Sequence, residues 1–98
     1  MARVSFISRM IVKAGREAEF VRVCEELTRI VRAQEPDAIY FEFFKLREPR
    51  RYAVLESFRS EEAEQRHMNS PWLAVRVPTI VACVDGTWER EYLDEFTA

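Results

Sequence analysis

The segment from Ala38 to Phe58 constrains the fold most, because it reads as two neighbouring strands with apolar side chains on both faces. Aromatic side chains occupy both sets of alternating positions on the first strand: Tyr40 and Phe44 on one face, Phe41 and Phe43 on the other. The second strand, over 51–58, repeats this pattern. A small antiparallel sheet usually leaves one face to solvent. We therefore expect helices of the chain to cover one face, while the other lines a cavity or meets a partner subunit.

Periodicity places the remaining elements around these two strands. The expected order is a strand over 4–12, a helix over 16–34, strands near 38–46 and 51–58, a helix from 61 to about 69, a helix from 71, and a strand over 87–93. Ser60 and the pair Ser70-Pro71 are typical helix starts. Pro78 interrupts the last helix and is expected either to kink it or to split it in two.

This order predicts one α+β domain over residues 1–98. With right-handed crossovers it gives a ferredoxin-like, four-stranded antiparallel sheet with all helices on one face. A domain of this size buries only about two-thirds of the surface of its unfolded chain, so its core is thin. Because 48% of the residues are apolar, a homodimer would give the surplus apolar surface a place to pack.

Charge and cysteine usage narrow the range of partners. The net charge is -2, from 15 basic and 17 acidic residues spread along the chain, which argues against nucleic acid and anionic membranes. Neither a signal peptide nor an apolar run of about 20 residues is present. Cys24 and Cys83 lie in predicted helices and outside any metal-binding motif, so we expect reduced thiols in a cytoplasmic protein and no metal site.

His67 is the only histidine and therefore the one obvious group that titrates near neutral pH. It follows Ala63 by four residues, so both should share the helix face that is turned toward the sheet. Two interpretations stay open: a catalytic or ligand-binding histidine, or a helix histidine that hydrogen-bonds a neighbouring backbone group.

Glu56 lies between Val54 and Phe58 on one face of its strand, where a carboxylate is costly unless it is paired or solvated. It could act as a general base or orient His67. A structural ion pair with Arg9 or Arg51 is the equally good alternative. Arg9 itself, set between two isoleucines, is either an anion-binding group in the cavity or an interface residue.

Several aromatic side chains could stack on a flat aromatic ligand: Tyr40, Phe44, Phe58 and Trp72, with Phe41 beside them. The same side chains would serve equally well as core, because aromatic pairs stabilise a fold with or without a ligand. The sequence has no glycine-rich phosphate loop and no nucleophile elbow, which disfavours nucleotide, flavin and serine-hydrolase mechanisms.

Three short segments resemble the antibiotic biosynthesis monooxygenase family of the dimeric α+β barrel superfamily. They are the strand-to-helix opening over 12–20, the strand over 52–58, and Ser60-Glu61-Glu62-Ala63 followed by His67 and Ser70. The similarity covers nearly the whole chain.

The resemblance implies a homodimer whose two sheets pack face to face, with a mostly apolar pocket in each subunit. It further implies oxidation by O2 of a small aromatic, phenolic or quinone-like compound without a cofactor, with His67 as base and Glu56 in support. Phe58 stands where the family often has tryptophan. The asparagine and the later histidine of a haem-degrading branch are missing, which disfavours haem cleavage.

Two other functions remain open from the sequence. One is a non-catalytic dimeric module that binds a small molecule or responds to stress. The other is an isomerase or lyase for a small anionic metabolite, for which Arg9 or another cation should point into the pocket.

Overall fold

The computed structural model describes residues 2–97 and contains four strands and three helices in the predicted order. The elements are β1 (Val4–Ile11), α1 (Glu17–Gln34), β2 (Ala38–Lys45), β3 (Arg51–Phe58), α2 (Glu61–Met68), α3 (Pro71–Cys83) and β4 (Glu89–Leu93). No helix among these residues is long and apolar enough to cross a membrane.

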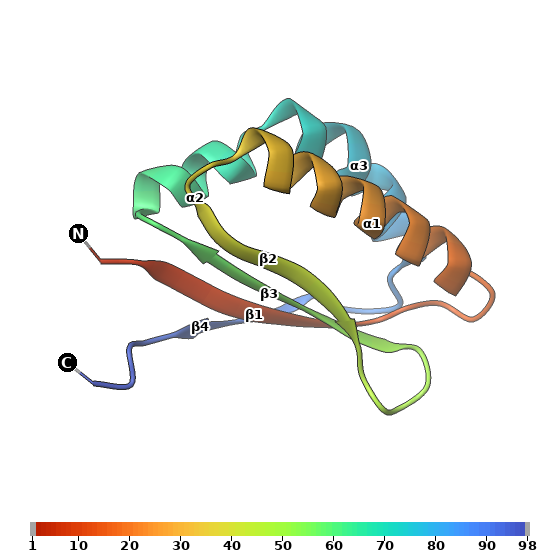
Figure 1. The fold of residues 1–98 in the computed structure, drawn as a ribbon. Helices are drawn as coiled ribbons and strands as arrows, with labels where there is room; N and C mark the ends of the chain where they lie inside the picture. The colour runs from red at the N-terminus through yellow and green to blue at the C-terminus, as the bar shows by residue number, and fades with distance from the viewer. Residues whose placement is uncertain (1, 98) are drawn as a thin grey trace.

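The four strands form one antiparallel sheet in the order β2-β3-β1-β4. Figure 1 shows all three helices on one face of this sheet, with the other face left bare by the chain. The predicted ferredoxin-like α+β fold is therefore confirmed. The central strand β1 pairs with β3 and β4, which sets Phe6 directly between Glu56 and Tyr92.

The core fills the space between the sheet and α1. Apolar residues spaced three or four apart give α1 one buried stripe, which holds Phe20, Val23, Cys24, Leu27 and Val31. This stripe packs with Met10 and Val54 from the strands and with Ile80 and Cys83 from α3. The predicted stripe of α1 is thus confirmed, and both cysteines lie in helices as free, buried thiols.

The outer face of the sheet is also apolar, as the alternation of side chains predicted. The strand register places on it Ile7, Ile11, Tyr40, Phe44, Ala53, Leu55 and Leu93. Tyr40 and Phe44 are 37% and 41% exposed. Since no helix of the chain covers this face, these side chains meet solvent in the single subunit.

The C-terminal third differs from the prediction in two places. Helix α3 stays one helix with Pro78 inside it, so it is not split in two. The sequence repeats apolar residues along this helix, but Ile80 is buried whereas Val81 is 62% exposed. The last strand begins at Glu89 rather than at 87. Trp88 precedes it and packs partly buried against the core.

Candidate active site

The side chain of His67 lies buried between α2 and the sheet. Ser60 caps α2 by accepting a hydrogen bond from the amide of Ala63 at 3.1 Å, which fixes where the helix begins. His67 follows two turns later and is only 2% exposed. Its imidazole packs against the rings of Phe41 and Phe58, with ring centres 5.3 and 5.1 Å away. The helix thus holds a titratable group in a dry, aromatic environment.

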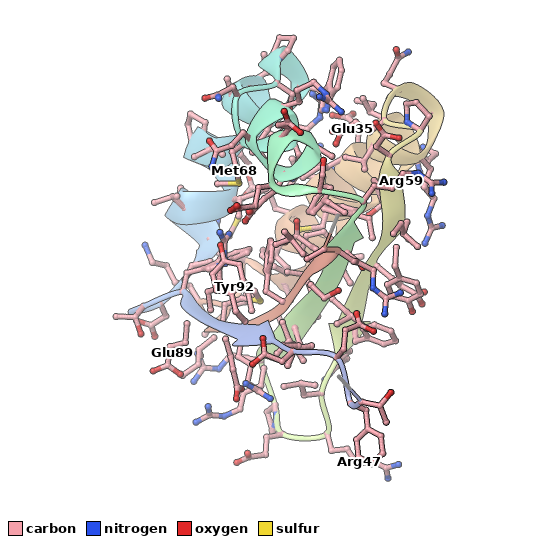
Figure 2. The ribbon with its side chains drawn as sticks, turned by 90° about the vertical axis from the view of Figure 1, so that its left-hand side faces the viewer. Glu35, Arg47, Arg59, Met68, Glu89 and Tyr92 are labelled. Carbon is pink, nitrogen blue, oxygen red and sulfur yellow. The ribbon has the colours of Figure 1, made fainter. Side chains whose placement is uncertain are left out.

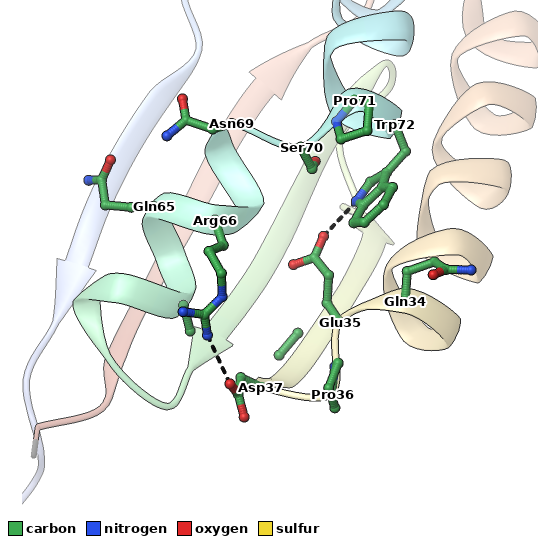
Figure 3. Close-up of a pocket in the computed structure, with 12 residues that line it drawn as sticks. Gln34, Glu35, Pro36, Asp37, Gln65, Arg66, Asn69, Ser70, Pro71 and Trp72 are labelled. Atoms are coloured by element: carbon green, nitrogen blue, oxygen red, sulfur yellow. Dashed lines mark hydrogen bonds and ion pairs between the residues drawn. The ribbon is translucent and has the colours of Figure 1, made fainter.

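One ring nitrogen of His67 contacts the carboxylate of Glu35, the residue that follows α1. The Nδ1 atom is 2.9 Å from Oε2 and 3.1 Å from Oε1 of Glu35. The indole N–H of Trp72 donates to the same Oε2 at 2.6 Å, as Figure 3 shows. Because an ionised carboxylate only accepts hydrogen bonds, we assign the proton of neutral His67 to Nδ1. The free lone pair is then on Nε2.

The second ring nitrogen faces Glu56 on β3. His67 Nε2 is 3.5 Å from Glu56 Oε1, and this oxygen forms no hydrogen bond within residues 2–97. Burial raises the pKa of Glu56 to about 8, against the opposing effect of nearby Arg90. Glu56 is therefore mostly protonated at neutral pH. His67 thus stands between the carboxyl groups of Glu35 and Glu56.

A small cavity lies beside Nε2 of His67, between the sheet and α3. Its volume is about 200 Å³. It is lined mainly by apolar side chains, with three polar exceptions: Leu27, Phe41, Phe43, Glu56, His67, Met68, Leu73, Val77, Ile80, Val81, Trp88 and Arg90. Figure 2 shows Met68 and Tyr92 on one side of the molecule and Glu35 on the other. The cavity thus adjoins the face of the histidine that is opposite Glu35.

A larger depression of about 520 Å³ lies on the other side of Glu35, where α1 ends and α2 meets α3 (Figure 3). Its rim carries several polar side chains, and an ion pair between Arg66 and Asp37 at 2.9 Å crosses it. Neither His67 nor Glu56 lines it. The smaller cavity is the better reaction site, because two buried titratable side chains, His67 and Glu56, meet there and burial raises the pKa of Glu56.

The structure brings part of the predicted site together. Glu56 and Phe58 both contact or face the His67 ring. Trp72 reaches it indirectly, since its indole holds Glu35 and lines the larger depression rather than the cavity. Glu56, Phe58 and Trp72 thus all lie around His67, as one site would require. Their roles in catalysis or binding stay predictions.

Tyr40, Phe44 and Arg9 lie on the outer face of the sheet and do not line the His67 cavity. Tyr40 donates a hydrogen bond to Glu42 at 2.8 Å, and Arg9 pairs with Glu91 at 3.0 Å. These three residues miss the cavity because successive side chains of a strand point to opposite faces of the sheet, and theirs point away from the helices.

The ion pairs proposed for Glu56 are not formed. Arg9 pairs with Glu91, and Arg51 lies 3.7 Å from Glu48. Both arginines are on the outer face, whereas Glu56 faces the helices. The alternative in which His67 hydrogen-bonds the backbone is also wrong, because the side-chain partner of its Nδ1 is a carboxylate.

Two residues of the site, Glu35 and Arg90, were missed by sequence reasoning. Glu35 follows the last turn of α1, where a solvated charge is ordinary, and only the fold brings it to His67. Arg90 had a usable signal, since the predicted alternation of the last strand places it on the same side as Tyr92.

The fold and this buried histidine define a class: an α+β ferredoxin-like domain with a small apolar cavity between its sheet and helices. The family model described as antibiotic biosynthesis monooxygenase matches residues 3–74, and the chain belongs to this family. Membership of this family supports monooxygenase activity as a property at the level of the family. No curated protein sequence matches the chain.

Solved structures with the same fold share little sequence with this chain. A candidate antibiotic biosynthesis monooxygenase from Caulobacter crescentus is 24% identical, with 95% of this chain and 89% of that chain covered and a TM-score of 0.91. SnoaB, a cofactor-independent oxygenase from Streptomyces nogalater solved as an N63A mutant, is 18% identical, with 100% and 97% covered and a TM-score of 0.83. Rv0793 from Mycobacterium tuberculosis is 13% identical, with 99% and 98% covered and a TM-score of 0.89. These likenesses show the fold.

Proposed function

We propose that the protein is a cofactor-independent monooxygenase that uses O2 to oxidise a small phenolic or quinol-type compound in the His67 cavity. The observation that carries the proposal is the pairing of His67 with Glu35 on one side and with a neutral Glu56 on the other. The family assignment supports it, and so does the similarity in fold to SnoaB, a cofactor-independent oxygenase.

His67 is the base of the proposed reaction. Triplet O2 reacts readily only with a good one-electron donor, so a phenol must first become a phenolate. The free Nε2 of His67 accepts the hydroxyl proton, and the ionised Glu35 stabilises the resulting imidazolium through Nδ1. The mainly apolar lining of the cavity provides a weakly polar environment for the radical pair that follows.

The atoms and electrons balance with the phenol and O2 alone. The phenolate gives one electron to O2, and the phenoxyl radical and superoxide combine to form a carbon–oxygen bond. Glu56 or the imidazolium protonates the distal oxygen of this peroxide. The oxygen–oxygen bond then breaks and the ring carbon loses its proton, which leaves a quinone and one water. Both hydrogens lost by the phenol end in that water.

Oxygen uptake by the purified protein tests the proposal. A panel of hydroquinones and phenols is supplied under air, without added flavin or metal and with a chelator present. We expect uptake by the wild type and a fall of about a hundredfold or more in His67→Gln. Glu35→Gln should lose about tenfold or more, because the amide cannot stabilise an imidazolium as a carboxylate does.

Glu26→Gln is the matched control, since Glu26 lies on α1, the helix that Glu35 follows, and pairs with Arg76 at 2.8 Å. It should leave uptake unchanged. Circular dichroism of every variant separates loss of chemistry from loss of fold. Equal uptake by wild type and His67→Gln would refute the assigned base, and no uptake with any panel member would refute the proposed reaction.

We also propose that two copies pack through the outer faces of their sheets. Support comes from the apolar side chains on that face, which include Ile7, Leu55 and Phe44 and which no helix of the chain covers. A two-fold axis through such a face buries the same patch on both copies. In this arrangement Tyr40 and Phe44 act as interface residues rather than as cavity walls.

A further inference from the structure

Arg90 approaches Glu56 across the sheet from β4. In the strand register Arg90 pairs with Ser8, whereas the next row holds Glu56, Phe6 and Tyr92. The guanidinium carbon of Arg90 stands 4.2 Å from the centre of the Phe6 ring. The side chain therefore leans out of its own row and toward the row of Glu56. Both side chains line the His67 cavity.

No carboxylate within residues 2–97 forms an ion pair with Arg90. Glu56 does not neutralise it, because that carboxyl is mostly protonated. Glu64 is engaged elsewhere, since its Oε2 accepts a hydrogen bond from the Tyr92 hydroxyl at 2.7 Å. An exposed guanidinium without a carboxylate partner among residues 2–97 thus borders a mainly apolar cavity.

Two further polar atoms on the same face of the sheet lack a partner. Ser8 Oγ and Glu56 Oε1 are buried and form no hydrogen bond with any residue that the structure describes. Leaving such an atom unpaired costs about 1–3 kcal/mol. A protonated carboxyl, a hydroxyl and a guanidinium can all donate hydrogen bonds. Of these groups only Glu56 and Arg90 line the cavity. They are called the donor wall below, and what this wall lacks is an acceptor with negative charge.

The size of the cavity limits the ligand. An apolar cavity of about 150 Å³ holds one benzene molecule. The His67 cavity, at about 200 Å³, therefore has room for one substituted ring and not for fused rings. Phe41, Phe43 and Trp88 line it and can pack against such a ring.

We propose that the donor wall recognises the carboxylate of a single-ring hydroxyaromatic acid. Arg90 takes the carboxylate with two parallel N–H donors, and the Glu56 O–H donates to it as well. The ring lies in the apolar part of the cavity, and its hydroxyl reaches Nε2 of His67. The binding step depends only on the cavity, while the oxidation of this acid rests on the function proposed above.

Calorimetric titration with two inert ligands of equal shape tests the binding step. Benzoate carries the charge and benzamide does not, and neither has a phenolic hydroxyl that could be oxidised. We expect the wild type to bind benzoate about tenfold tighter than benzamide, and to bind 2-naphthoate more weakly than benzoate. Arg90→Gln should abolish the preference for the charged ligand, whereas Arg90→Lys should keep part of it.

Arg51→Gln is the matched control, because Arg51 lies on the opposite face of the sheet and borders no part of this cavity. It should bind like the wild type. Equal binding of benzoate and benzamide, a preference that survives in Arg90→Gln, or equal binding of a short aliphatic acid would each overturn the inference.

Oxygen uptake with 2,5-dihydroxybenzoate and 2,5-dihydroxybenzamide then separates the two proposals. Selective binding of benzoate without uptake of oxygen would support the donor wall and refute the monooxygenase. Uptake that is equal for acid and amide would support the monooxygenase and refute the donor wall.

Discussion

At the scale of single residues, environment rather than residue type decides what the two glutamates beside His67 can do. Glu35 accepts hydrogen bonds from Trp72 and His67 at the edge of the domain. Glu56 is buried on the sheet, and its Oε1 has no partner among residues 2–97. One carboxylate can therefore stabilise a cation while the other can donate a proton, which is a common division of labour in acid–base catalysis.

The raised pKa of Glu56 makes stability depend on pH. Its pKa is about 8 in the folded protein against an ordinary value of 4.5. Between these values the folded state binds more protons than the unfolded state, so the free energy of unfolding falls as pH rises. The expected slope from this group is about 1 kcal/mol per pH unit between pH 5 and 7. Urea unfolding of wild type and Glu56→Gln measures it.

Comparing wild type with Glu56→Gln isolates the effect of Glu56, since every other titrating group is common to both proteins. The difference in unfolding free energy between wild type and variant should shrink and then reverse as pH rises. Parallel curves across this range would mean that Glu56 titrates normally in the folded protein.

At the scale of elements, the junction of α2 and α3 places the histidine. Ser70 begins α3 by accepting from the amide of Leu73 at 3.4 Å, and its hydroxyl donates to the carbonyl of His67 at 2.7 Å. The residue is only 4% exposed. One side chain thus ties the end of the helix that carries His67 to the start of the helix that covers the cavity.

Replacing the two cap serines one at a time separates stability from positioning. Ser60→Ala and Ser70→Ala each remove a helix cap, so each should lower the free energy of unfolding by about 1 kcal/mol. Only Ser70→Ala also frees the His67 end of α2, so it should reduce oxygen uptake more than Ser60→Ala does. Denaturant titrations give the free energy of unfolding, and assays on the same preparations give the rate of oxygen uptake. Equal loss of uptake in the two variants would assign Ser70 a purely stabilising role.

Sequence patterns predicted the elements well, because each depends on neighbours along the chain. The stripe of α1, the caps Ser60 and Ser70 and the doubly apolar β2 were all readable. The site was readable only in part. His67 and Glu56 stood out by rarity and by strand position, whereas Glu35 depends on a contact between residues 32 positions apart. The alternation of Tyr40 and Phe44 with Phe41 and Phe43 was also readable, but the pattern does not say which of the two faces the helices cover, and Tyr40 and Phe44 were assigned to the wrong one.

At the scale of the whole molecule, the two faces of the sheet differ in whether the chain covers them. The inner face holds the core and the cavity, while the outer face leaves apolar side chains without cover from the chain. Edge strands β2 and β4 border that face, and exposed Tyr40, Phe44 and Leu93 extend the patch to both edges. Exposed apolar side chains on an uncovered face, with the Arg9–Glu91 ion pair among them, are consistent with an interface.

A charge placed at the centre of that face should disrupt the proposed dimer. Leu55 lies on β3, next to the central strand, and Leu55→Arg would bury a guanidinium against its own symmetry mate. Sedimentation velocity at about 20 µM should give twice the 11.6 kDa chain mass for the wild type and a shift toward a single chain for the variant. Val75→Arg is the matched control, because Val75 is 71% exposed on α3, away from the outer face. A stable single chain in the wild type at this concentration would refute the dimer, and so would a Leu55→Arg variant that stays dimeric.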